Sequence, residues 1–230
     1  MDDAAIELAL TESEHELAAG HAPDLRTLGF WRAVAAVKRR RELVERYASR
    51  IAAIDRQAFR RHVRFVFPVD LGIALVVGGL VIDLVFLAVA LGAAHPWREI
   101  LVLVGTAGLI VATHGIAHLA VGALVGISFT DWFFDLPKRP QPGFKIDYAS
   151  YLRASPRQRA WMHAAGAIAT KLTPFVVIPY ALAIGSDTWA VLIVLAIGIV
   201  QIVTDVLFSV KASDWKKFRR EMRLAPRRPS

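Results

Sequence analysis

The chain has 230 residues, 55% of them hydrophobic, and a formal net charge of +8 at neutral pH. This composition is too apolar for an ordinary soluble domain and too charged for bare membrane spans, so we expect a membrane core with basic segments outside it. The absence of cysteine excludes a thiolate metal site, a disulfide framework and a cysteine nucleophile. Because most basic residues lie beside apolar runs, we expect anionic lipid rather than nucleic acid as the partner of this charge.

Residues 1–65 predict a cytoplasmic, amphipathic helical segment. Residues 1–20 favour a short acidic surface helix. From Leu28 to about Val63, apolar residues recur at near-helical spacing with basic residues between them, which predicts one or two further helices. Their basic face either fixes the orientation of the protein in the membrane or binds anionic lipid or a partner.

Four apolar stretches approach or exceed the length needed to cross a bilayer. We expect a membrane domain over residues 66–210 and a basic tail over residues 211–230. The predicted spans are about residues 71–94, 100–126, 161–184 and 189–210. Lys and Arg gather before the first span, between the second and third, and after the fourth, so the positive-inside rule places both termini in the cytoplasm. We therefore expect an integral protein of a bacterial or archaeal cell membrane.

The connection between the second and third spans has a distinct pattern. Residues 127–136 are largely apolar and aromatic, and several prolines and a glycine follow them. This pattern indicates a short hairpin, a re-entrant segment that would line a site, or an aromatic belt on the membrane interface. Ser155 followed by Pro156 is typical of a helix start.

Two histidines lie four residues apart inside the second span. At helical spacing His114 and His118 share one face, one turn apart, where two imidazoles can chelate a divalent metal. Ionisable side chains inside a membrane span are functional candidates by default. The spacing is that of the H-E-x-x-H zinc helix, but Gly115 stands in the place of the glutamate.

A carboxylate in the fourth span lies at the depth of this histidine pair. At a rise of 1.5 Å per residue, His114 lies about 21 Å from the outer end of its span and Asp205 about 24 Å from Trp189. Two histidines and one carboxylate are a common catalytic ligand set for zinc or iron(II), with a position left for water. The sequence thus makes His114, His118 and Asp205 a candidate metal site.

The histidine motif resembles that of a known family. His114-Gly-Ile-Ala-His118, followed by Leu124-Val-Gly-Ile127, is similar to the zinc helix of the site-2 protease family of intramembrane metalloproteases, whose motif is typically H-E-x-G-H. Residues 155–166 resemble the approach to that family's next core helix. Asp205 stands where a later helix of the family supplies the third ligand.

This resemblance covers about residues 100–218 and implies both a fold and a chemistry. The fold would be an all-α membrane protein of four spans with a three-helix core like that of site-2 proteases. The bound metal would be Zn²⁺, held by His114, His118 and Asp205. The partners would be the lipid bilayer and a transmembrane protein or peptide substrate.

The chain also departs from the family. Gly115 replaces the general base, Ala167 replaces a proline, and the usual neighbours of the third ligand are absent around Asp205. A zinc-bound water still becomes more acidic without the glutamate, but losing general acid–base catalysis costs about 100- to 10,000-fold in rate. We therefore favour a zinc-binding relative that is weakly active or non-catalytic. The alternative is an active metallopeptidase in which Asp131, Asp135 or Asp205 supplies a relocated base.

Other polar residues in or beside the spans need partners. Lys171 lies close to the depth of the histidine pair, and we expect it either to pair with Asp83 or to face the metal as an auxiliary group. His163 is expected to be an interfacial hydrogen-bonding residue rather than a fourth ligand. Asp214 is expected to cap a basic helix beginning at Trp215, with a ligand role as the alternative.

Two further classes of function remain open from the sequence. One is a haem or metal carrier, or a small transporter that uses His114, His118, Lys171 and Asp205 as a relay. Histidines on adjacent turns of one helix argue against haem, and the repeat symmetry or broken helices of a transporter are not visible. The other is a structural or scaffold protein in which the histidines form hydrogen bonds between helices.

Overall fold

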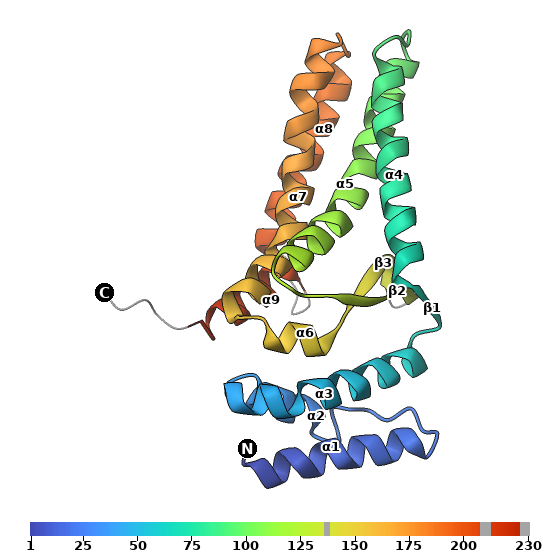
Figure 1. The fold of residues 1–230 in the computed structure, drawn as a ribbon. Coiled ribbons are helices and arrows are strands. Elements are labelled where there is room, and N and C mark those ends of the chain that lie inside the picture. Colours follow the sequence, from blue (N-terminus) through green and yellow to red (C-terminus); the bar gives the residue numbers. More distant parts are fainter. Residues whose placement is uncertain (136–138, 208–212, 226–230) are drawn as a thin grey trace, which may run out of the picture. The chain divides into compact units, whose positions relative to one another are not determined.

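The computed structural model describes residues 1–135, 139–207 and 213–225. These residues form nine helices and one three-stranded antiparallel sheet (Figure 1). The chain divides into two compact units, residues 1–72 with 123–155, and residues 73–122 with 156–230. Each unit is described separately below.

The first unit begins with three helices, α1 (Asp3–Ala18), α2 (Phe30–Val37) and α3 (Arg41–His62). On α3 the apolar residues recur every three or four positions, and each is at most 3% exposed because it faces a core shared with α1 and α2. These residues are Leu43, Tyr47, Ile51, Ile54 and Ala58. The helices predicted from the periodicity of this part of the sequence are confirmed.

A small sheet completes this unit together with a short helix. The strands β1 (Phe65–Pro68), β2 (Phe129–Asp135) and β3 (Arg139–Ile146) pair antiparallel in that order, and α6 (Tyr148–Arg153) follows. The predicted hairpin is therefore present as β2 and β3. The prediction missed β1, because four residues ending in proline carry no alternation that can be recognised.

Charged contacts join the sheet to α3. Lys145 of β3 forms an ion pair with Asp55, and both side chains are largely buried. Arg60 donates to the Oδ1 atom of Asp131 over 2.6 Å, and Arg56 lies 3.4 Å from its Oδ2 atom. Burial alone would raise the pKa of Asp131, but hydrogen bonds and the charge of Arg60 outweigh it, so the pKa lies below its usual value. The connection between the second and third spans thus folds with the N-terminal helices.

The second unit contains the long helices. Four helices are long and apolar enough to cross a membrane, namely α4 (Val69–Ala90), α5 (Trp97–Leu124), α7 (Pro156–Ala183) and α8 (Thr188–Leu207). The four predicted spans are confirmed as helices, although α7 begins at Pro156 rather than at Trp161. The prediction of an all-α protein agrees with these helices, but the first unit also contains a three-stranded β-sheet, which an all-α class does not include.

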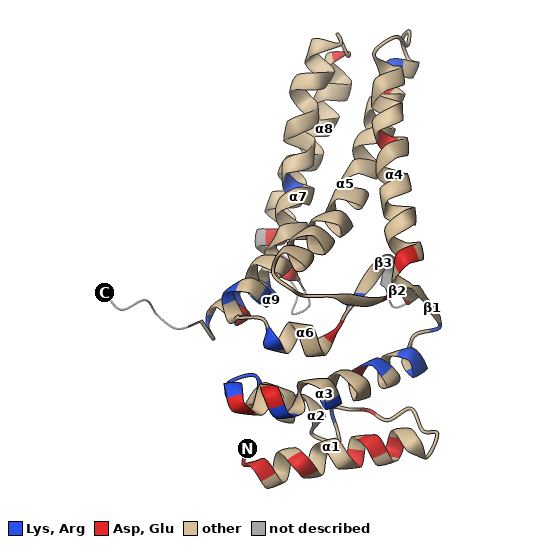
Figure 2. Ribbon diagram, in the orientation of Figure 1, with Lys and Arg blue, Asp and Glu red and all other residues tan. Residues whose placement is uncertain are grey.

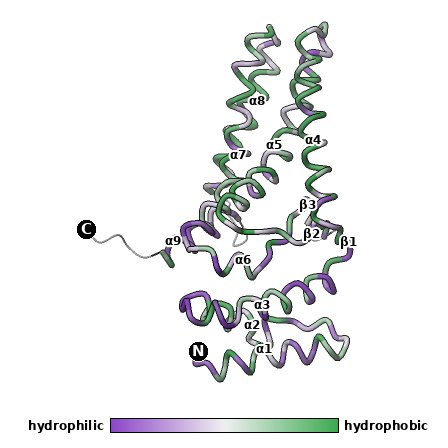
Figure 3. The backbone as a smooth tube through the Cα atoms, in the orientation of Figure 1, coloured by the Kyte–Doolittle hydropathy of each residue, from purple (hydrophilic) through white to green (hydrophobic). Residues whose placement is uncertain are grey.

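The surfaces of these helices support a membrane location. Large apolar side chains stay more than half exposed on all four helices, a surface that hydrocarbon solvates and water does not. Examples are Val81, Val111, Val176 and Val200. Charged residues are sparse along these helices and frequent on α1 and α3 (Figure 2). The residues of the long helices are mainly hydrophobic, whereas α1 and α3 contain many hydrophilic residues (Figure 3).

Replacing Asp131 with asparagine tests the contact between the sheet and α3. The Asp131 side chain is 1% exposed and binds two arginines, so Asp131→Asn should lower the free energy of unfolding by about 1–3 kcal/mol. Thermal unfolding of the purified protein in detergent, followed by circular dichroism, measures the change. The matched control is Asp3→Asn, because Asp3 pairs with Arg40 at half-exposed positions, where an ion pair contributes at most about 1 kcal/mol. Equal effects of the two variants would contradict a stabilising role of Asp131.

Candidate metal centre

The two histidines of α5 face the same side of that helix. His114 and His118 lie one turn apart, and their ring centroids are 4.7 Å apart. The predicted shared face is therefore confirmed. Both side chains belong to the second unit, as do α7 and the short helix α9 (Asp214–Met222).

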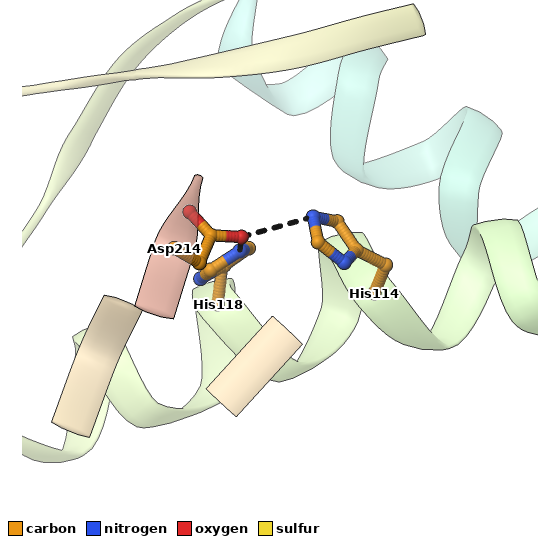
Figure 4. A group of neighbouring side chains, drawn as sticks. All are labelled: His114, His118 and Asp214. Atoms are coloured by element: carbon orange, nitrogen blue, oxygen red, sulfur yellow. Dashed lines mark hydrogen bonds and ion pairs between the residues drawn. The ribbon is translucent and has the colours of Figure 1, made fainter. Parts of the chain in front are cut away.

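The carboxylate beside this pair is that of Asp214, the first residue of α9. The cap of α9 is Ser213, whose hydroxyl accepts a hydrogen bond from the backbone N–H of Lys216 over 3.4 Å. The prediction that Asp214 caps a helix beginning at Trp215 is therefore wrong. Because the serine hydroxyl caps the helix, the carboxylate of Asp214 points to α5 instead (Figure 4).

Buried contacts hold α9 against α7. Arg159 Nε donates to Glu221 Oε2 over 2.8 Å, and these side chains are 2% and 0% exposed. The ring of Phe218 packs edge-on against Trp161 and Trp215 at centroid distances of 5.6 and 5.7 Å. This packing determines where Asp214 lies.

The distances at the cluster match those of a metal site. The Oδ2 atom of Asp214 lies 3.3 Å from Nε2 of His118 and 3.6 Å from Nε2 of His114 (Figure 4). The three ligand atoms all lie within 4.8 Å of one another. In a tetrahedral zinc site with bonds of 2.0–2.1 Å, neighbouring ligand atoms stand about 3.3 Å apart.

Hydrogen bonds on the far side of each ring determine which nitrogen faces the cluster. Nδ1 of His118 lies 2.7 Å from the carbonyl oxygen of Met162, which can only accept, so Nδ1 carries the proton. The hydroxyl of Thr170 donates to the carbonyl of Gly166, so it accepts from Nδ1 of His114 over 2.9 Å. Nε2 of each ring therefore faces Asp214, and in the neutral ring this atom carries the lone pair, an arrangement typical of ligating histidines.

The charge on Asp214 is balanced from its other side. Lys217 Nζ lies 3.0 Å from Oδ1 of Asp214, which leaves Oδ2 for the histidines. Burial disfavours the ionised carboxylate, but the contacts with His118 and Lys217 outweigh it, so the pKa of Asp214 lies well below its usual value. Asp214 is thus a carboxylate throughout the neutral pH range and can bind a cation.

Asp205, the third ligand expected from the sequence, has a different neighbour in the structure. Its Oδ2 atom lies 2.6 Å from Nζ of Lys171, which also donates to the carbonyl of Ala167. Lys171 thus pairs with Asp205 rather than with Asp83, and its Nζ atom lies 5.9 Å from the ring centroid of Trp215. The pair links α7 to α8 beside the residue that follows Asp214.

The other candidates divide between the two units. His163 is a buried residue of α7, 5% exposed, and lies outside the group of three possible ligands. Asp131 and Asp135 belong to β2 in the first unit, where Asp131 binds arginine. Gly115 lies on α5 between the two histidines.

Gly166 is a structural requirement of the site that the sequence analysis did not assign. A Cβ atom added to Gly166 would overlap the imidazole of His118. The absence of a side chain at this position of α7 lets the ring lie against the helix and reach the carbonyl of Met162. A glycine inside a predicted span was the available signal, but its partner could not be known without the packing of α5 on α7.

Substitution of Gly166 should disturb the site. Gly166→Val places two methyl groups where His118 stands, so zinc affinity should fall about 10- to 100-fold, the usual effect of losing a contact that orients a ligand. Isothermal titration of the metal-free protein with Zn²⁺ measures this. Gly78→Val is the control, because a Cβ atom at Gly78 of α4 meets nothing within 4 Å. Unchanged affinity in Gly166→Val would show that His118 does not need this position to bind metal.

Comparison of the chain with known protein families, with curated proteins and with solved structures finds no match. The resemblance to site-2 proteases therefore depends on the residues quoted above, and the chemistry of the cluster has to be argued from its own geometry.

Proposed function

We propose that this protein is an integral membrane protein that binds one divalent metal ion, zinc, through His114, His118 and Asp214. It acts as a weakly active or non-catalytic relative of the intramembrane metalloproteases that its histidine motif resembles. Both termini lie in the cytoplasm, as the distribution of Lys and Arg indicates.

The main support for this proposal is that Nε2 of His114, Nε2 of His118 and Oδ2 of Asp214 converge on one point. With both rings neutral and protonated on Nδ1, two Nε2 lone pairs and a carboxylate oxygen face one another, and a cation between them would satisfy all three acceptors. A charge-assisted hydrogen bond from a protonated ring would be about 2.7–2.9 Å long. The distances from Asp214 to His118 and His114 are 3.3 and 3.6 Å, which favour a metal ion over a proton.

The ligand types favour zinc. Neutral imidazole and carboxylate are common zinc ligands, and two histidines with one carboxylate leave a fourth position for water. Zinc lowers the pKa of such a water and can polarise a carbonyl oxygen. The same arrangement could therefore bind the carbonyl of a transmembrane peptide even where cleavage is slow.

The identity of residue 115 argues for slow or absent catalysis. The H-E-x-x-H motif supplies its proton carrier from the residue after the first histidine, and Gly115 has no side chain to do this. Asp214 bonds to Lys217 and faces the histidines, and Lys171 pairs with Asp205, so these groups already have partners. We infer that the protein binds a transmembrane segment of a protein or peptide rather than cutting it rapidly.

Metal analysis of purified variants tests the site. The wild-type protein should contain zinc by mass spectrometry, and both His118→Ala and Asp214→Asn should contain one zinc ion fewer per chain than the wild type, because each removes a ligand. The double variant Lys171→Met with Asp205→Asn removes the neighbouring ion pair without leaving a lone charge, and it should retain zinc. Loss of zinc from the double variant but not from Asp214→Asn would assign the third ligand to Asp205 instead. Absence of zinc from the wild type would contradict the proposal.

Restoring the missing carboxylate tests the catalytic part. Gly115→Glu should raise cleavage of a model transmembrane peptide at least about 100-fold, the lower end of what a general base contributes. Release of a fluorescent fragment in detergent measures the rate. Gly115→Gln is the matched control, since it adds a side chain of the same size without a basic oxygen. If both variants cleave equally, the missing carboxylate is not what limits activity.

A further inference from the structure

We propose a second divalent cation site at the end of the helical bundle opposite the metal centre, formed by His95, Glu99 and Asp187. His95 lies in the connection between α4 and α5, Glu99 in the first turn of α5, and Asp187 in the connection between α7 and α8. Both connections lie at the same end of the second unit (Figure 1). This site goes beyond the proposed function and shares no residue with it.

The three side chains converge on one point. Nδ1 of His95 lies 3.4 Å from Oε2 of Glu99 and 3.2 Å from Oδ2 of Asp187. All three ligand atoms lie within 4.8 Å of one another. The two distances from His95 are close to the edge of a tetrahedral zinc coordination shell, about 3.3 Å.

A buried oxygen without a hydrogen bond points to a ligand. Glu99 is 1% exposed, and within the described residues its Oε2 atom is buried and accepts no hydrogen bond. Its Oε1 atom accepts from the backbone N–H of Asp187 over 3.3 Å, which turns Oε2 toward His95. A buried carboxylate oxygen left unpaired costs free energy, and a metal ion bound at this point would remove that cost.

The surrounding contacts hold the three ligands in place. Arg98, next to Glu99 in sequence, donates to the backbone carbonyls of Gly185 and Ala93, over 2.9 and 3.2 Å. These bonds connect the two loops. The indole N–H of Trp189 donates to Oδ2 of Asp187 over 3.3 Å. Two carboxylates outnumber the single imidazole, so the three ligands together carry a net negative charge that a divalent cation would balance.

Another histidine of the chain shows what an ordinary surface pair looks like. His21 has the same side-chain exposure as His95, 64%, and lies 2.8 Å from Oε2 of Glu16. That distance is a normal hydrogen bond to a single, exposed carboxylate. The longer distances and second carboxylate at His95 distinguish the two cases.

Imidazole with two carboxylates is typical of sites for zinc and neighbouring first-row divalent metals. A cation here would bridge the loop between α4 and α5 to the loop between α7 and α8. It would therefore couple the two helical hairpins of the second unit at the end where Arg98 already links them.

The test uses the His114→Ala, His118→Ala double variant, which lacks the first site. Metal-free protein in detergent is titrated with Zn²⁺ by isothermal calorimetry. One equivalent of zinc should still bind and raise the melting temperature. Adding His95→Ala or Asp187→Asn should weaken this binding at least tenfold, whereas adding His21→Ala should leave it unchanged. The side chains of His95 and Asp187 are 64% and 48% exposed, so these variants should fold.

Zinc binding that survives both His95→Ala and Asp187→Asn would overturn the proposal, and so would a double variant that binds no zinc. The converse experiment separates the two sites. A chain carrying only His95→Ala and Asp187→Asn should keep one zinc at the metal centre. If zinc is lost from only one of these two double variants, the site that is left intact in that variant is the one that does not bind zinc.

Discussion

The buried ion pair between Arg159 and Glu221 holds α9 on α7, and the candidate metal centre of His114, His118 and Asp214 depends on it. Both side chains are almost fully buried, and removing one partner of such a pair typically costs about 3–5 kcal/mol because the other is left charged and without compensation. The aromatic contacts of Phe218 add to this attachment. Asp214 reaches the histidines because α9 is fixed in this position, so a contact outside the cluster determines its third member.

Within the cluster, small and polar groups of α7 orient the histidine rings. Gly166 makes room for His118, and its carbonyl positions the Thr170 hydroxyl that accepts from His114. Both rings then turn Nε2 to Oδ2 of Asp214. Lys171 and Asp205 form an ion pair nearby, which explains how two charges persist in apolar helices.

The membrane helices could be predicted because a bilayer leaves few options for the backbone. Every N–H and C=O group in hydrocarbon needs an internal partner, so apolar runs of this length form helices. The amphipathic spacing around Tyr47 and Ile51 likewise revealed α3. Strand β1 could not be found in this way, since its pairing with β2 joins residues such as Val66 and Phe133, which lie far apart in the chain.

The sequence by itself determined that His114 and His118 share a face, because four residues make about one helical turn. It could not choose between Asp205 and Asp214 as their partner. Counting residues estimates depth along a helix axis and does not give the direction in which Asp205 faces. Rotation about the axis and the return of α9 onto α7 are set by side-chain packing, which turned Asp205 to Lys171 and brought Asp214 to the histidines. The second cluster of His95, Glu99 and Asp187 depends in the same way on two loops that meet only in the folded chain.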